Sequence, residues 1–171
     1  GVLEFIEAAR VVKKDIPSAR FVLAGMIDLD NPAALTLEEI SYFTSQGFIE
    51  YQGHQQDIPS LLNQASIVVL PSYREGMPKI LLEASAVGRA IITTDVPGCR
   101  DAIINGVTGI LVPPKDSMVL ASAIALLANS PEQCMDFGKA GRDLAVKKFD
   151  INSVISKHFD CYQSLLDASQ N

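Results

Sequence analysis

A short segment of almost continuous apolar residues, "SIVVLPS" (66–72), and a second strand-like segment, "AIITTD" (90–95), lie on either side of a stretch with helical character that ends at Gly88. Strands that are apolar on both faces are typical of parallel sheets, because helices cover both sides of such a sheet. Parallel neighbours also need a long connection between them, which is usually a helix. These residues therefore predict a parallel strand–helix–strand unit.

The same alternation extends over most of the chain and predicts an α/β fold. Five strands are expected, at residues 20–25, 48–53, 66–72, 90–95 and 108–114. Helices or helical turns are expected at residues 1–14, 36–47, 58–65, 78–88, 98–106 and 117–129. Strands and helices in this order form a Rossmann-like, doubly wound parallel sheet, which binds ligands at the carboxyl ends of its strands.

The whole chain, residues 1–171, is interpreted as a single domain. It is long enough to bury one sizeable core, and no linker or internal repeat divides it. Residues 131–171 form a helical tail after the last strand, with a break between two helices near Phe149–Asp150. The first helix begins without a capping residue or an initiator methionine, so we expect the sequence to be a piece of a longer chain.

Composition argues against several classes of function. The net charge is −6, and no basic stripe of the kind that binds nucleic acid is present. No apolar segment approaches the roughly 18–20 residues needed to cross a bilayer. Cys99, Cys134 and Cys161 are far apart and lack CxxC spacing. We therefore expect reduced thiols in a cytosolic protein, with neither a disulfide framework nor a zinc site.

The segment "PSYREGMPK" (71–79), between the third predicted strand and the next helix, has the features of an anion site. Gly76 permits a close backbone approach, and Pro78 suits the first helical position, where its missing N–H has no cost. Free amides near Gly76 and Lys79, together with the helix dipole, can hold a diphosphate. This loop at a strand's carboxyl end is the first candidate site.

Two carboxylates, Glu75 and Glu83, accompany the loop. Glu83 lies about one turn into the predicted helix, where a carboxylate can accept hydrogen bonds from the two neighbouring hydroxyls of a ribose. Glu75 could accept from hydroxyls of a group attached beyond the diphosphate. A structural interpretation is equally open, in which Glu83 pairs with Lys79 and Glu75 only complements the helix dipole.

The segment "PSYREGMPKILLEASAVGRAIITTDVPGCRDAIINGVTGILVPPKD" (71–116) closely resembles the C-terminal, nucleotide-sugar-binding domain of retaining glycosyltransferases with the GT-B fold. The family is GT4, whose signature of two glutamates separated by seven residues is matched here by Glu75 and Glu83. The likeness covers essentially the whole chain and is strongest over residues 66–116.

The resemblance implies roles for individual residues. Glu75 is expected to be the catalytic-site glutamate that holds hydroxyls of the donor sugar. Backbone amides around Gly76 and Met77 are expected to cradle the sugar and the diphosphate. Glu83 is expected to hold the ribose hydroxyls, with Leu82 lining the ribose–base site.

Four further residues complete the expected donor site. Pro78 and Lys79 open the helix whose start would face the diphosphate. The segment "YQGHQQDIPSLL" resembles the family's glycine-containing loop that faces the donor. Gly53 could therefore permit a close approach, and His54 could donate to a phosphate. A lone histidine after a strand is also commonly a loop residue without a ligand, and this alternative stays open.

The implied reaction is retaining, metal-independent transfer of a hexosyl or N-acetylhexosaminyl group from a nucleotide-diphosphate sugar, with a UDP-sugar as the expected donor. The acceptor would be a glycan or a lipid-linked glycan, and neither a metal nor a cofactor is expected. Related enzymes carry an N-terminal domain that supplies the acceptor site, so this chain alone is expected to be inactive.

The full-length enzyme is expected in the cytoplasm, at the inner face of a bacterial membrane, in the synthesis of surface polysaccharide or lipopolysaccharide. Two alternatives stay open. One is a nucleotide-sugar epimerase of the GT-B type, and the other is a noncatalytic scaffold with an inherited pocket.

Overall fold

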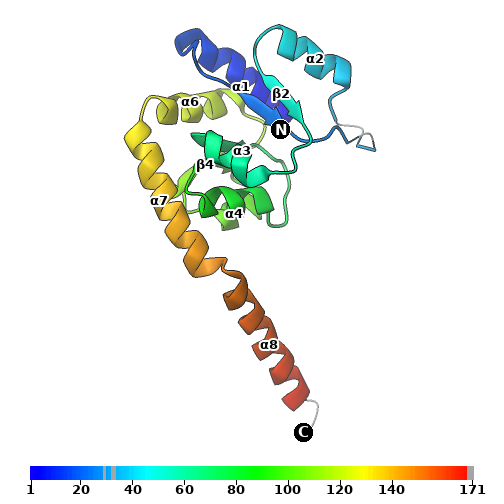
Figure 1. Cartoon of the computed structure of the whole chain (residues 1–171), viewed down its shortest axis with the longest axis vertical. Helices are drawn as coiled ribbons and strands as arrows, with labels where there is room; N and C mark the ends of the chain where they lie inside the picture. The colour runs from blue at the N-terminus through cyan, green and yellow to red at the C-terminus, as the bar shows by residue number, and fades with distance from the viewer. Residues whose placement is uncertain (29, 32–33, 169–171) are drawn as a thin grey trace.

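The computed structural model describes residues 1–28, 30–31 and 34–168 and has the expected alternation of strands and helices (Figure 1). The strands are β1 (Val22–Ala24), β2 (Glu50–Gly53), β3 (Ile67–Leu70), β4 (Ala90–Thr94) and β5 (Gly109–Val112). The helices are α1 (Val2–Asp15), α2 (Leu37–Ser45), α3 (Ile58–Gln64), α4 (Lys79–Ala86), α5 (Cys99–Ala102), α6 (Ser117–Ala128), α7 (Pro131–Lys148) and α8 (Ile151–Ala168). Every predicted element is confirmed in its place along the chain. The last residues of the predicted tail, 169–171, lie outside the described residues.

All strand pairs are parallel, as the sequence predicts, but the strands form two sheets instead of one. β1 pairs with β2, and β3, β4 and β5 form a second sheet in that order. In the second sheet Ile67 of β3 lies opposite Ala90, and Ile91 lies opposite Gly109 of β5. All five residues of the central strand β4 are buried. The predicted single sheet is therefore divided between β1 and β3.

The strand β1 is only partly buried. Phe21 is buried, whereas Val22 and Leu23 are half-buried and Ala24 is exposed. In the described structure β1 has a hydrogen-bonded neighbour on one side only, so less of each side chain is covered.

One hydrophobic core joins the two sheets beneath α1 and α6. It combines Phe5 and Ile6 of α1 with Ile124 of α6, Phe21 before β1 and Ile92 of β4. The rings of Phe5 and Phe21 meet edge to face, with their centroids 5.6 Å apart. Because this core reaches residues of both sheets, the two sheets belong to the same domain.

A second core lies beneath α4 and α5. It contains Leu81 and Ala84 of α4, Cys99 of α5 and Ile91 of β4. Ile91 and Ile92 are adjacent on β4, and adjacent strand residues point to opposite faces of a sheet. Helices therefore cover both faces of the sheet formed by β3, β4 and β5, which confirms the doubly wound layering.

The helical tail consists of α7, which packs along α4, and α8, which projects away from the rest of the chain (Figure 1). Gly138 of α7 lies against the end of α4, where a Cβ built on Gly138 would be 2.1 Å from the carbonyl oxygen of Gly88. The break near Phe149–Asp150 is confirmed, because Phe149 ends α7 and the Asp150 carboxylate accepts a hydrogen bond from the Asn152 amide at 3.0 Å.

Apolar side chains along α8 are exposed. These are Ile151, Ile155, Phe159, Tyr162, Leu165 and Leu166. Among the described helices, none combines the length and the apolar character that crossing a bilayer requires.

Candidate functional site

The loop 71–78 leaves the carboxyl end of β3 and leads into α4. Hydroxyl groups of β4 hold its first part, because Thr93 Oγ1 donates to the carbonyl of Leu70 at 2.7 Å and Thr94 Oγ1 donates to the carbonyl of Ser72. Ser72 Oγ in turn donates to Glu75 Oε1 at 2.7 Å. Both the backbone at Ser72 and the Glu75 carboxylate are therefore fixed by hydrogen bonds.

The same loop is connected to α1 through Tyr73. The Tyr73 hydroxyl donates to Glu4 Oε1, and this hydrogen bond raises the pKa of Tyr73. Lys115, which follows β5, places its Nζ 5.2 Å from the centroid of the Tyr73 ring. The backbone on the N-terminal side of Glu75 is thus held by residues of three other segments.

Gly98 lies against the other side of the loop. Its φ is +82°, and a Cβ built on it would be 2.2 Å from the carbonyl oxygen of Gly76 and 2.7 Å from that of Glu75. Only glycine permits this approach without a shift of the backbone. The turn after β4 therefore sets the position of the Glu75–Gly76 peptide.

The start of α4 presents backbone amides to solvent. Pro78 is the residue before the helix, where its carbonyl accepts a hydrogen bond from Leu81 N at 3.0 Å. Pro78 therefore lies one residue before the first helical position, whereas the sequence predicts it at that position. In the described structure no side chain accepts a hydrogen bond from the first amides of α4. Gly76, Met77 and Lys79 are exposed beside this helix end.

Glu83 is half-buried on α4 and lines a groove of about 380 Å³ between α4 and the junction of α7 with α8. Leu82 and Ala86 line the groove from α4. The α7–α8 side consists of Arg142, Ala145, Val146, Phe149, Asp150 and Ile151. No ion pair joins Glu83 to Lys79 in the described part of the chain. The interpretation of Glu83 as the partner of Lys79 is therefore not supported.

Gly53 and His54 lie at the end of β2, in the other sheet. Gly53 has a φ of +62°, and its carbonyl accepts a hydrogen bond from Gly25 N at 2.8 Å. His54 is exposed, and no hydrogen bond or ion pair of the described residues connects it to the loop 71–78. The left-handed conformation explains the glycine at 53, whereas no contact assigns a role to His54.

Arg100 pairs with Asp95, the residue that follows β4. Arg100 Nε lies 2.5 Å from Asp95 Oδ1, and this hydrogen bond raises the pKa of Arg100. The neighbouring Asp101 carboxylate instead accepts a hydrogen bond from Gly98 N at 3.2 Å. Among the described residues no group of three metal-ligating side chains is found.

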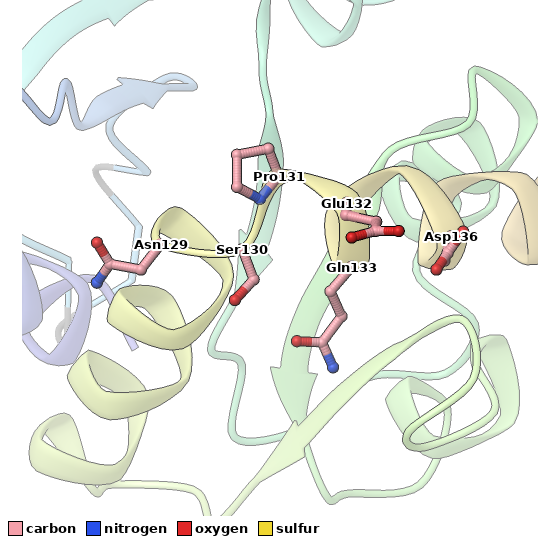
Figure 2. Close-up of a pocket in the computed structure, with 6 residues that line it drawn as sticks. All are labelled: Asn129, Ser130, Pro131, Glu132, Gln133 and Asp136. Atoms are coloured by element: carbon pink, nitrogen blue, oxygen red, sulfur yellow. The ribbon is translucent and has the colours of Figure 1, made fainter.

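A second hollow, of about 450 Å³, lies where α6 ends and α7 begins (Figure 2). Its lining is Asn129, Ser130, Pro131, Glu132, Gln133 and Asp136. The lining holds two carboxylates and no basic side chain, so its charge opposes a diphosphate. It also lies at the opposite end of α7 from the groove that contains Glu83. The loop 71–78 and α4 are thus the better candidate for an anionic ligand.

A family model described as "Glycosyl transferases group 1" matches residues 1–144 of this chain. The matched range contains both sheets, the loop 71–78 and α4. The chain belongs to the group 1 glycosyltransferases.

Individual relatives agree with this assignment. Over 166 residues the chain is 35% identical to N,N′-diacetylbacillosaminyl-diphospho-undecaprenol α-1,3-N-acetylgalactosaminyltransferase of Campylobacter jejuni, a match that covers 97% of this chain and 42% of that protein. Sucrose-phosphate synthase from Thermosynechococcus elongatus matches with a TM-score of 0.82 and 25% identity, over 96% of this chain and 43% of that structure.

The pneumococcal O-GlcNAc transferase GtfA, solved with UDP and GlcNAc, has the same fold at 20% identity. Its TM-score is 0.79, and the match covers 97% of this chain and 33% of that structure. This group 1 glycosyltransferase chain therefore spans less than half the length of each of these relatives. The predicted resemblance to glycosyltransferases of the GT-B type is confirmed.

In this group 1 glycosyltransferase chain, three residues that support the loop 71–78 were not predicted from the sequence. They are Ser72, Thr94 and Gly98. The sequence offers partial signals for two of them, since Thr94 ends a strand with a second hydroxyl residue, Thr93, before it and Gly98 follows a proline in the next turn. The contacts of Thr94 and Gly98 join residues distant in the sequence, so no local pattern reveals those two.

Proposed function

We propose that this chain is the donor-binding domain of a retaining glycosyltransferase that uses a nucleotide-diphosphate sugar, with UDP as the nucleotide. The observation that carries the proposal is the start of α4, where free backbone amides lie between two half-buried carboxylates, Glu75 and Glu83. Such a helix end attracts an anion, whereas each carboxylate accepts hydrogen bonds from hydroxyl groups. A diphosphate with a sugar on each side has this distribution of charge and hydroxyls.

The diphosphate is proposed to bind at the amides around Gly76, Met77 and Lys79, after the turn at Pro78. The positive end of the helix dipole stabilises negative charge there, and the charge on the diphosphate increases as the sugar leaves. The Lys79 ammonium is exposed at the same end. This arrangement supplies the stabilisation that a metal ion gives in other enzymes, so no metal or cofactor is included in the proposal.

Glu83 is proposed to accept hydrogen bonds from the two ribose hydroxyls, with Leu82 beside the ribose and base. The groove of about 380 Å³ that these residues line supports this assignment, because it combines one acceptor with apolar wall residues such as Phe149. Glu75 is proposed to accept from hydroxyls of the transferred sugar. Gly53 and His54 are proposed to approach the donor from the end of β2.

The acceptor of the whole protein is proposed to be a glycan or a lipid-linked glycan. The name of the Campylobacter jejuni relative describes transfer of N-acetylgalactosamine to an undecaprenol-linked sugar. This name supports an N-acetylhexosaminyl group and a lipid-linked acceptor. An acceptor site outside these 171 residues and a place at the inner face of a bacterial membrane during polysaccharide synthesis complete the proposal. Transfer by this chain alone is not expected, and nucleic acid is not a proposed partner.

The two carboxylates are expected to respond differently to substitution. Glu83→Gln should weaken the binding of UDP by about tenfold or more, because hydrogen bonds to a charged acceptor are stronger than those to an amide. Glu75→Gln should leave UDP binding unchanged and weaken the binding of UDP-glucose or UDP-N-acetylglucosamine only. Calorimetry, or amide chemical shifts for millimolar affinities, would measure both effects.

Glu132→Gln is the matched control, because Glu132 is an exposed glutamate in the hollow of Figure 2. It should change neither affinity. An unchanged UDP affinity in Glu83→Gln would remove the ribose assignment. If the unsubstituted chain binds neither UDP nor UDP-sugars at millimolar concentration, the noncatalytic scaffold becomes the better interpretation.

A further inference from the structure

We propose that Ser72 is a positioning residue that holds the Glu75 carboxylate ready to accept a hydroxyl of the donor sugar, an inference that rests on the proposed function. Ser72 Oγ donates to Glu75 Oε1 at 2.7 Å, which is a normal length for a hydroxyl–carboxylate hydrogen bond. The contact is partly buried, so water competes with it less than it would on an open surface.

Ser72 is itself fixed by the neighbouring strand. The hydroxyl of Thr94 donates to the Ser72 carbonyl, and Thr94 is 1% exposed. One residue earlier in β4, Thr93 Oγ1 donates to the carbonyl of Leu70 at 2.7 Å. The bond from Thr93 lies at the last backbone pair of β3 and β4, Leu70 with Thr93, and the bond from Thr94 extends the connection past it to Ser72. The backbone of Ser72 is thus anchored to the buried central strand β4, and its side-chain hydroxyl group contacts Glu75.

The backbone of Glu75 is held from the opposite side by Gly98. A Cβ on Gly98 would lie 2.7 Å from the Glu75 carbonyl oxygen, so there is no free space between the two backbones. With the backbone fixed, the remaining freedom of Glu75 is rotation about its side-chain bonds. Ordering a glutamate side chain on binding costs conformational entropy. The bond from Ser72 removes part of this freedom before the ligand arrives.

The geometry also leaves an acceptor for the ligand. Ser72 binds Oε1 of Glu75, and no other hydrogen bond of the described residues involves the Glu75 carboxylate. Oε2 is therefore available to a sugar hydroxyl. One oxygen of the carboxylate accepts a hydrogen bond from the protein, which orients the group, and the other oxygen can still accept a hydrogen bond from the ligand.

The test uses the 171-residue chain with UDP, UDP-glucose, UDP-N-acetylglucosamine and UDP-N-acetylgalactosamine as probes. Ser72→Ala should weaken the binding of the best UDP-sugar by about tenfold and leave UDP binding within about twofold. Ser72→Thr keeps the hydroxyl group and should restore most of the affinity. Ser66→Ala is the matched control, because Ser66 is an exposed serine directly before β3 and should change nothing.

A double-mutant cycle separates positioning from a general effect on the fold. If Ser72 acts through Glu75, then adding Ser72→Ala to Glu75→Gln should weaken UDP-sugar binding less than it does in the unsubstituted chain. Thermal unfolding of all variants identifies any that lose the fold.

Three results would overturn the inference while the proposed function stands. They are a Ser72→Ala variant that matches Ser66→Ala, an equal loss of UDP and UDP-sugar affinity, and full additivity with Glu75→Gln. An unsubstituted chain that binds none of the four probes overturns the proposed function and this inference together.

Discussion

The Gly98→Ala substitution is expected to lower the free energy of unfolding by about 3 kcal/mol and to weaken the binding of UDP-sugars. Two physical effects add. Gly98 has a φ of +82° and a ψ of −53°, a sparsely populated conformation that costs an L-residue about 1–3 kcal/mol. The new Cβ would also lie 2.2 Å from the carbonyl oxygen of Gly76, and overpacking of this kind costs about 1–3 kcal/mol. The backbone of the loop 71–78 must move to relieve the contact.

Gly106→Ala is the control that separates these two effects. Gly106 has a φ of +74°, but no atom lies within 4 Å of a Cβ built on it. This variant should therefore show only the conformational cost, about 1–2 kcal/mol, with unchanged UDP-sugar affinity. Chemical denaturation monitored by circular dichroism would give the free energies of unfolding. Equal destabilisation by the two substitutions would show that the contact between Gly98 and Gly76 has no energetic weight.

The Gly138→Ala substitution in α7 is expected to lower the free energy of unfolding by about 2–3 kcal/mol. Its Cβ would lie 2.1 Å from the Gly88 carbonyl oxygen, which is a backbone atom and cannot rotate away. Relief requires α7 to move away from α4 or the turn at Gly88 to shift. Gly88 has a φ of +69°, so this turn is itself restricted to a narrow range of conformations.

Gly141→Ala, one turn further along α7, is expected to have the opposite sign. The nearest atom to its Cβ would be Ser85 Cα at 3.7 Å, an ordinary van der Waals contact. Alanine is favoured over glycine inside a helix by about 0.5–1 kcal/mol, so this variant should be as stable as the parent or more stable. Destabilisation of both variants to the same extent would indicate that α7 tolerates no added methyl group and that the distance to Gly88 is irrelevant.

The sequence predicts the strands and helices well because each has a strong local pattern. The β-branched residues at 91–94 predict the central strand β4, and the turn residues near Gly88 and Phe149 predict the ends of α4 and α7. The division of the sheet is not predicted, because strand pairing depends on which backbones meet in space. The apolar sequence of β1 looks the same whether one neighbour covers it or two.

In the candidate site too, local patterns predict some features, whereas contacts between distant segments are not predicted. Helical spacing predicts that Glu83 lies about one turn into the helix, and the structure places it in a groove beside α4. The contact of Ser72 with Glu75 is local, yet a serine three residues before a glutamate occurs in many settings and is not specific. The approach of Gly98 to Gly76 joins two loops, and only the folded backbone reveals it.

The separation of the strands into two sheets, between β1 and β3, affects how the chain can pair with further strands. Of the five described strands only β4 is paired on both sides, so β1, β2, β3 and β5 each present an open edge. Open edges are templates for another strand, and natural proteins protect them with charge, proline or a covering segment. The strands β1 (VLA) and β3 (IVVL) contain neither charge nor proline. Both are therefore receptive to a further parallel strand, and one strand that paired with both would reduce the number of open edges from four to two.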